Sequence, residues 1–289
     1  MRCGWPALAL IAVLGIAGCA APAVPADAAK PDAIAHWDTA MTWRTLDPEN
    51  VLAVDTGKGT IYIELHPEIA PQAVERIKLL ARRGSYDGLQ FWRVVPKFVV
   101  QVDVGNVEGG KTELPNLAPE FRFRLQPGAD HAVAARPQGL EEGFIGATPY
   151  VAVQEGSTAT PKAADGSRSA WVTYCTGVVG MGRDTARDSA NAELFFMTGA
   201  YPGLDGQFTP VGRIVAGQQL LDDLPPGEPP AQPEALQTIR VLADVPDAPK
   251  VRVMDMHGPA FDRMVAKARR ERGADFSICD IDVPAMIVP

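Results

Sequence analysis

Residues 84–101 read GSYDGLQFWRVVPKFVVQ, and this stretch decides the fold. Apolar, β-favouring residues fill Phe91–Val95 and Phe98–Val102. Pro96 separates the two runs, because proline cannot donate a hydrogen bond to a strand ladder. Two short strands are therefore predicted here. Arg93 lies in the first and Gln101 in the second, so the candidate chemistry begins in this stretch.

The residues before this stretch predict a strand pair and a helix. Val51–Asp55 and Thr60–Leu65 are β-favouring runs, and the Thr-Gly-Lys-Gly sequence between them is a hairpin signal. A helix is expected to begin near Pro71, which suits a first helical turn, and to stop at Gly84. Apolar residues recur at helical spacing between these two positions.

The residues after this stretch predict an insertion, a few strands and a C-terminal appendage. Residues 105–170 are rich in Gly, Pro, Ala and Gln and predict a long loop insertion. Three strand-like segments and a short helix follow: Trp171–Met181, Leu194–Met197, Val211–Val215 and Gln218–Leu224. Five prolines in residues 225–233 indicate a stiff connector. A strand at Leu236–Val245 and a helix ending at Gly273 then predict the appendage.

The N-terminus predicts export and membrane attachment. An apolar run, Ala7–Ile16, is too short to span a bilayer and is typical of a cleaved export signal. The small residues before Cys19 resemble the lipobox of bacterial lipoproteins, which implies a signal peptide at 1–18 and acylation of Cys19. Residues 19–36, mostly Ala, Pro and Asp, would be a tether. The alternative is an ordinary secretory signal cleaved within Ala20–Ala29. By the same resemblance, the alanine after Cys19 favours a periplasmic location on the outer membrane.

The cysteines outside the N-terminal region predict a disulfide. Cys3 lies inside the signal and Cys19 at the anchor, which leaves Cys175 and Cys279. In an oxidising compartment this pair would close a loop of about 100 residues and contribute about 4 kcal/mol in the chain-entropy model. Two unrelated buried thiols are the alternative.

The composition narrows the functional classes. With 289 residues, 46% hydrophobic and 21% charged, the chain is typical of a globular protein. Its formal net charge of −8 argues against nucleic acid as a partner. The four histidines show no ligand spacing, and no phosphate loop or nucleophile elbow is present, so we expect no metal and no other cofactor.

The stretch at 84–101 looks like the signature of the cyclophilin family. In that family a Tyr-Asp-Gly turn leads to a strand carrying an arginine, and Phe98 and Gln101 follow Arg93 at the family's spacing. A second block resembles the other half of the pattern: Val178–Gly182, Glu193–Phe196, Leu204–Gly206 and Val211–Gly217. The resemblance covers roughly residues 51–224 apart from the insertion.

The resemblance implies a mainly β fold and a domain organisation. The fold would be a closed antiparallel eight-stranded barrel capped by two helices. The barrel domain would occupy residues 37–224, with the long loop insertion at about 105–170. Residues 225–289 would form the connector and a small strand-helix appendage.

The resemblance also implies a peptidyl-prolyl cis-trans isomerase that binds proline-containing segments. Arg93 would be the catalytic residue, together with Phe98 and Gln101. The substrate-binding residues would be Val99, Gly182, Arg183, Glu193, Phe195, Leu204 and Phe208, with Phe196 as the fallback for Phe195. Phe98, Phe195 and Leu204 would form an apolar cup for the proline ring.

These residue types suit the reaction. Rotation about an X-Pro bond faces a barrier of about 18–20 kcal/mol, because the amide loses resonance when it twists. The twisted amide has a pyramidal nitrogen that can accept a hydrogen bond, so one fixed guanidinium can favour the twisted state. The leading hypothesis is therefore a prolyl isomerase that assists exported envelope proteins, and a monomer is expected.

The rim of the expected site departs from the family pattern and keeps other hypotheses open. Many members of the family have other residues at five of these positions. This chain has Trp92 where they have His, Arg183 near the position of their substrate-binding Asn, Glu193 where they have Gln, Gly203 where they have Trp, and Phe208 where they have His. Glu193 could pair with Arg93, or it could compete with the substrate for the arginine's donors. The second hypothesis is a non-catalytic peptide-binding or chaperone module of the same fold. The third is a structural lipoprotein that acts through its C-terminal appendage.

Overall fold

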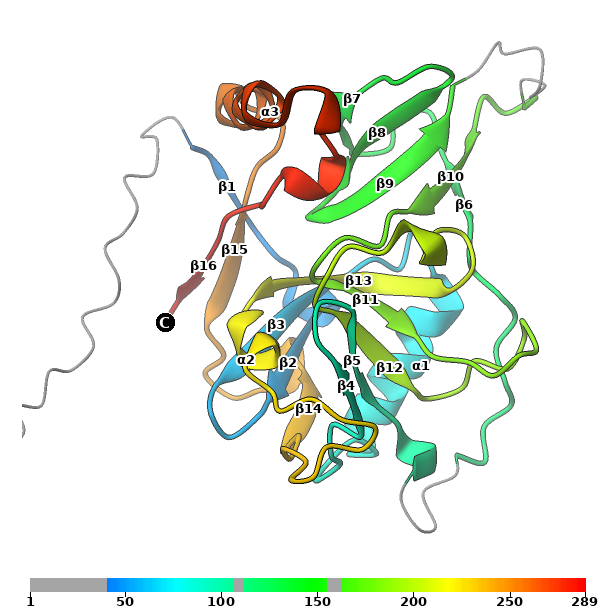
Figure 1. Ribbon diagram of the computed structural model, residues 1–289, viewed down its shortest axis with the longest axis vertical. Coiled ribbons are helices and arrows are strands. Elements are labelled where there is room, and N and C mark those ends of the chain that lie inside the picture. The colour runs from blue at the N-terminus through cyan, green and yellow to red at the C-terminus, as the bar shows by residue number, and fades with distance from the viewer. Residues whose placement is uncertain (1–40, 107–111, 155–162) are drawn as a thin grey trace, which may run out of the picture. The chain divides into compact units, whose positions relative to one another are not determined.

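β-Strands dominate the computed structural model, which describes residues 41–106, 112–154 and 163–289 (Figure 1). The expected signal peptide, the tether and Cys19 lie outside these residues. Within the described ranges, no helix is both long enough and apolar enough to cross a membrane.

The largest sheet has eight antiparallel strands in the order β14-β2-β3-β13-β11-β12-β5-β4. Its strands are β2 (Val51–Asp55), β3 (Thr60–Leu65), β4 (Arg93–Val95), β5 (Val99–Val102), β11 (Val178–Met181), β12 (Leu194–Met197), β13 (Thr209–Ala216) and β14 (Thr238–Val241). The predicted hairpin is present as β2 and β3, and the two strands on either side of Pro96 are present as β4 and β5. The mainly β prediction is confirmed.

The expected closed barrel is not found, because the eight-stranded sheet is open between β14 and β4. Residues 225–237 cross this gap and make irregular hydrogen bonds instead of a ladder. Phe91 N–H donates to the carbonyl of Glu234, and Leu236 N–H donates to the carbonyl of Leu89. The connector is rich in proline, which lacks the backbone donor that a regular strand needs.

Two helices belong to the segments that form this sheet. Helix α1 (Pro71–Arg82) begins with a proline at its first turn and buries Val74, Ile77 and Leu80 in the core, as the helical spacing predicts. Helix α2 (Gln219–Asp222) is a single turn. The described residues also contain six 3-10 turns: Pro48–Asn50, Val104–Asn106, Pro202–Leu204, Leu242–Asp244, Gly273–Asp275 and Ile278–Asp280.

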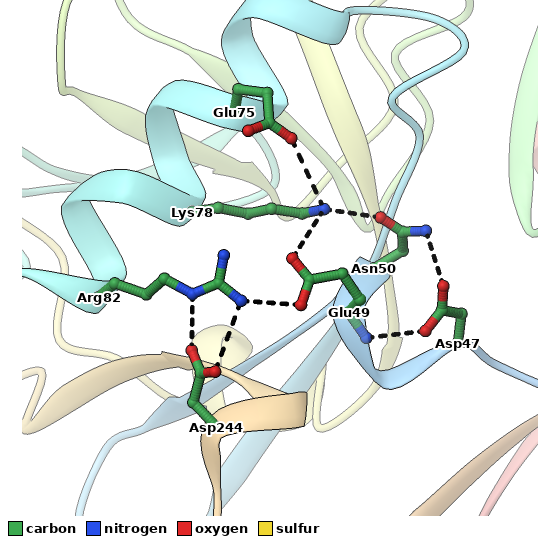
Figure 2. A network of polar contacts seen from close by, with 7 residues as sticks. All are labelled: Asp47, Glu49, Asn50, Glu75, Lys78, Arg82 and Asp244. Atoms are coloured by element: carbon green, nitrogen blue, oxygen red, sulfur yellow. Dashed lines mark hydrogen bonds and ion pairs between the residues drawn. The ribbon is translucent and has the colours of Figure 1, made fainter.

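A network of polar contacts fixes α1 to the neighbouring turns (Figure 2). The buried Lys78 donates from Nζ to Asn50 Oδ1 at 2.8 Å. Arg82, one helical turn later, pairs with Glu49 at 2.7 Å and with Asp244 at 2.8 Å. The hydrogen bond from Arg82 is the largest cause that holds the pKa of Glu49 below its usual value. The network joins the helix to segments that lie before β2 and after β14.

The insertion is an ordered sheet rather than the expected loop. It contains β6 (Phe123–Leu125), β7 (Ala132–Ala135), β8 (Leu140–Ile145), β9 (Thr148–Val153) and β10 (Arg168–Val172), paired antiparallel in the order β6-β10-β9-β8-β7. Alanine and glycine occupy many of its buried positions, including Ala132, Gly143 and Ala152. These small residues give little strand signal in the sequence, although neighbouring strands bury them.

A three-stranded sheet joins the N-terminal and C-terminal parts of the described chain. Strand β15 (Lys250–Met254) pairs with β1 (Trp43–Thr45) on one side and with β16 (Ala285–Val288) on the other. The strand predicted at 236–245 does not belong to this appendage, because its central part is β14 of the eight-stranded sheet. Helix α3 (Pro259–Arg272) ends before Gly273, as predicted. The predicted disulfide between Cys175 and Cys279 is confirmed.

The buried carboxylate of Glu64 links the three sheets. Glu64 lies in β3 and accepts hydrogen bonds from Arg44 of β1 at 2.7 Å and from the backbone N–H of Ala147, between β8 and β9, at 2.9 Å. His66 lies beside it, 3.8 Å from Nε2 to the carboxylate. Burial alone would raise the pKa of Glu64, but His66, Arg44 and Ala147 outweigh it and hold the pKa below its usual value. Glu64 is therefore an anion in the folded protein.

Candidate active site

The strand register places the candidate site residues in one row across four strands. Arg93 of β4 is paired with Gln101 of β5, Gln101 with Phe195 of β12, and Phe195 with Gly180 of β11. Directly paired residues of antiparallel strands point to the same face of the sheet. The local pairing alone therefore brings together side chains that lie far apart in the sequence.

Arg93 is held by contacts on two of its nitrogens. Its Nη1 donates to Gln101 Oε1 at 2.6 Å, and its Nε lies 3.2 Å from Glu228 Oε2. The guanidinium carbon also lies 5.8 Å from the centroid of the Phe98 ring, within the range of a cation–π contact. A quarter of the Arg93 side chain is exposed, so the guanidinium is fixed and still reachable by a ligand.

Glu193 contacts the arginine only indirectly, through Gln101. The Gln101 amide donates from Nε2 to Glu193 Oε1 while its oxygen accepts from Arg93. Burial and the nearby Asp103 raise the pKa of Glu193 to about 7, although Gln101 and Arg93 oppose the shift. A Cβ at Gly182 would overlap the Glu193 carboxylate, so the glycine makes room for it. The sequence left open a pairing of Glu193 with Arg93, and the geometry replaces it with an indirect link in which Glu193 orients Gln101 and Gln101 holds the arginine.

Aromatic rings build the apolar part of the site. Phe195 is buried, and its ring centroid lies 5.6 Å from that of Phe208, which it meets edge-on, and 5.6 Å from that of Tyr174, which is tilted by 30°. A Cβ at Gly180 would lie 2.5 Å from the Phe195 ring, so the glycine is required for the ring to lie there. Phe196 is fully buried and packs against Phe91 instead. Phe195 is thus the phenylalanine that shares a face with Arg93 and Gln101.

The other expected cup residues lie around these rings. Val99 is buried in β5, two residues from Gln101 and on the same face of the strand. Phe98 and Leu204 are partly buried and pack against the core. The Phe98 N–H donates to Thr198 Oγ1 at 3.1 Å, which fixes Phe98 at the end of β12.

Arg183 braces the rim of the site instead of standing free in it. Its guanidinium lies 4.5 Å from the Phe208 ring centroid, and its Nη2 donates to the carbonyl of Gln207 at 3.1 Å. Gly182, Arg183 and Glu193 also line a cavity of about 380 Å³ that extends to Asn191.

Two residues at the site were not predicted from the sequence. Tyr201 is half exposed and lies 4.9 Å from Phe98, and a Cβ at Gly203 would come within 2.7 Å of its ring. The Tyr201 ring therefore covers the rim beside Gly203, where the family has a tryptophan. The glycine at this position was the only feature of the sequence that could have indicated a neighbouring ring. Glu228 is the second residue, and its place in a proline-rich connector gave no signal.

No group of three or more His, Cys, Asp or Glu side chains that could hold a metal ion occurs in the described part of the chain. The features that are present are a fixed, partly exposed guanidinium and aromatic rings on one face of the same sheet. This arrangement combines apolar surface with hydrogen-bond donors on one face, which is the chemistry that an X-Pro segment would need.

Comparison with known proteins identifies the family. The family model for cyclophilin type peptidyl-prolyl cis-trans isomerase/CLD matches residues 51–243. A probable peptidyl-prolyl cis-trans isomerase of Brucella suis is 30% identical over 187 residues, covering 65% of this chain and 77% of the relative. A peptidyl-prolyl cis-trans isomerase of Helicobacter pylori is 27% identical over 179 residues, covering 61% of this chain and 80% of the relative.

A solved structure agrees with this assignment. The crystal structure of cyclophilin AquaCyp293 from Hirschia baltica superposes with a TM-score of 0.77 at 30% identity, covering 85% of this chain and 93% of that one. The chain therefore belongs to the cyclophilin-type peptidyl-prolyl cis-trans isomerase family, and isomerase is its enzyme class.

Proposed function

We propose that this isomerase assists the folding of exported envelope proteins and that Arg93 stabilises the twisted prolyl amide of its substrates. The observation that carries the mechanism is the fixation of Arg93 beside the aromatic cup, at 2.6 Å from Gln101. A proline ring held by Phe98, Phe195 and Leu204 would bring its amide nitrogen to the guanidinium. No nucleophile is needed, because the reaction only rotates a bond.

The energetic role of Arg93 follows from a difference between two states of the substrate. The planar amide nitrogen shares its lone pair with the carbonyl and accepts hydrogen bonds poorly, whereas the twisted nitrogen has a free lone pair. A donor that is fixed before the reaction stabilises the twisted state without any cost of reorganisation. Removing one such donor from an enzyme typically lowers kcat by about 100-fold to 1,000-fold.

The test is an NMR exchange assay on a blocked Ala-Pro peptide. We expect the wild type to accelerate exchange and Arg93→Ala to lower kcat at least about 100-fold. Arg240→Ala is the matched control. Arg240 lies away from the site and pairs with Asp87, with 2.6 Å between the nitrogen and the carboxylate oxygen. Equal activity of Arg93→Ala and wild type would overturn the mechanism. Peptide binding without any acceleration by the wild type would instead identify the non-catalytic binding module.

We further propose that the chain acts in the periplasm as a monomer, held to the outer membrane by acyl chains on Cys19. The apolar run before Cys19 and the Ala- and Pro-rich residues after it support this location. The disulfide between Cys175 and Cys279 is consistent with an oxidising compartment. Cys19→Ser should release the protein from membranes, and incorporation of labelled palmitate should be lost. Palmitate-free wild-type protein would contradict lipidation.

A further inference from the structure

The start of the connector is fixed against β4, directly beside the candidate catalytic arginine. Val94 N–H donates to the carbonyl of Gly227 at 2.8 Å, and Gly227 N–H donates back to Val94 at 3.0 Å. A second bridge joins Gly227 to Pro230, and a Cβ at Gly227 would lie 2.5 Å from the Pro230 Cα. The turn is therefore tight. Glu228 directly follows Gly227, and Gly227 is hydrogen-bonded to Val94, the residue next to Arg93.

This anchoring brings the Glu228 carboxylate to Nε of Arg93, the guanidinium nitrogen that is bonded to the aliphatic part of the side chain. The Glu228 Oε2 is 3.2 Å from Arg93 Nε, whereas Gln101 holds Nη1. A planar guanidinium that is bonded at two different nitrogens keeps the direction of its plane. Its Nη2 and the second hydrogen of Nη1 then point in fixed directions.

We propose that Glu228 is a positioning residue for the isomerase reaction, acting through Arg93. The inference rests on the proposed function, because it requires Arg93 to donate to the twisted amide. Glu228 pairs with the guanidinium, whereas the proposed proline cup is formed by Phe98, Phe195 and Leu204. Its loss should therefore lower kcat and leave KM nearly unchanged. The C-terminal part of the chain thereby contributes to a site that otherwise comes from residues 93–208.

The negative charge of Glu228 has an opposing effect, because it lowers the positive potential that the substrate nitrogen meets. Half of the Glu228 side chain is exposed, so water screens this contribution. Hydrogen bonding to the twisted nitrogen depends on direction as well as on charge. We therefore expect positioning to dominate, with a fall in kcat when the carboxylate is removed.

The experiment compares Glu228→Gln with Glu234→Gln in the NMR exchange assay over a range of peptide concentrations. Glu234 lies on the same connector, and its carboxylate pairs with Lys58 at 2.7 Å instead of with the arginine. We expect Glu228→Gln to lower kcat about fivefold, equivalent to about 1 kcal/mol, with KM within about twofold of wild type. Glu234→Gln should match the wild type. Glu228→Asp, which keeps the charge, should recover part of the lost kcat.

A spectroscopic signal separates positioning from a general loss of structure. The Nε–H resonance of Arg93 in a ¹H–¹⁵N spectrum should move in Glu228→Gln and stay in place in Glu234→Gln. An unchanged Arg93 resonance together with wild-type kcat would overturn the inference, as would an equal fall in kcat for both variants. If the wild type is inactive, or if Arg93→Ala is as active as wild type, the proposed function itself fails. Those two results are distinct from a failure of Glu228→Gln alone.

Discussion

Glu193 should make the isomerase activity depend on pH near neutrality. Its pKa is raised to about 7, so the neutral carboxyl dominates about tenfold at pH 6 and the carboxylate about tenfold at pH 8. A carboxylate can only accept hydrogen bonds, so it forces the Gln101 amide to turn its nitrogen toward Glu193 and its oxygen toward Arg93. A neutral carboxyl accepts more weakly and can also donate, which loosens this orientation.

The size of the effect follows from the strengths of the two hydrogen bonds. A bond to a charged group contributes about 1.5–3 kcal/mol and a neutral one about 0.5–1.5 kcal/mol. The difference of about 1 kcal/mol corresponds to about a fivefold change. We therefore expect kcat/KM on a blocked Ala-Pro peptide to be about fivefold lower at pH 6 than at pH 8, with a midpoint near 7. Glu193→Gln should lose the inflection near pH 7.

The groups around Glu193 determine how the profile is interpreted. Asp103 and Asp184 add negative charge beside it and Arg93 adds positive charge. Asp205, on the loop that carries Leu204 and Phe208, has a pKa raised by burial to about 6. An inflection near 6 that persists in Glu193→Gln would therefore come from Asp205. A flat wild-type profile from pH 6 to 8, or the same midpoint near 7 in Glu193→Gln, would refute the reasoning.

The same carboxyl should affect stability with a predictable sign. The folded-state pKa of Glu193 is raised from 4.5 to about 7, so the folded protein binds this proton more tightly than the unfolded chain does. The wild type should consequently lose stability as the pH rises from 4.5 to about 7. In urea unfolding experiments, the stability of Glu193→Gln relative to wild type should increase as the pH rises from 4 to 8. If the difference in unfolding free energy between the two proteins does not change with pH, this sign is wrong.

Three further predictions concern the rim, the disulfide and the link between the sheets. Tyr201→Ala should raise KM about twofold to tenfold with little change in kcat, because the Tyr201 ring beside Phe98 would offer a bound peptide an aromatic contact of about 0.5–1.5 kcal/mol; an effect on kcat alone would contradict a binding role. Replacing Cys175 and Cys279 by serine should lower the free energy of unfolding by about 4–5 kcal/mol, since the crosslink spans 104 positions; an unchanged urea midpoint would refute it. Glu64→Gln should cost about 1–3 kcal/mol by the same measurement, because the partly exposed Arg44 and the N–H of Ala147 would lose their charged acceptor; an unchanged urea midpoint would show that these contacts add no net stability.

Local sequence patterns predict the elements of this fold better than their assembly. The strands on either side of Pro96 and the helix from Pro71 follow from β-branched runs and from apolar spacing, which act within a few residues. The openness of the eight-stranded sheet depends instead on how residues 225–237 meet β4, far away in the sequence. Composition marks that segment as a stiff connector and does not show which strand it contacts.

The insertion shows a second reason why sequence patterns and the folded structure differ. Strands β7 and β8 contain Ala132, Ala134 and Gly143, whose small side chains carry almost no strand preference of their own. Burial against neighbouring strands stabilises them, and that burial exists only after folding. A loop is the expected interpretation of such a sequence, even though the segment forms a sheet.

The residues of the candidate site also fall into two groups, those that local sequence spacing predicts and those that only the folded structure brings to the site. Arg93, Phe98 and Gln101 are recognisable because they lie within nine residues of one another and keep a known spacing. Glu228 and Tyr201 reach the same site through turns that fix their backbone, and no spacing relative to Arg93 reveals them. The role that Glu193 takes depends on the position of the Gln101 amide, which only the three-dimensional arrangement provides.

The position of β14 at one end of the eight-stranded sheet limits how the protein can be divided. A fragment that stopped at residue 224 would lose β14, and β2 would become an uncovered edge along Val51–Asp55. Exposed edges of this kind offer free backbone donors and acceptors to other chains and promote aggregation. A chain truncated at this point should therefore aggregate more readily than the full chain. A single cut within the connector should have a smaller effect, because the disulfide between Cys175 and Cys279 keeps the C-terminal residues, and with them β14, attached to the sheet.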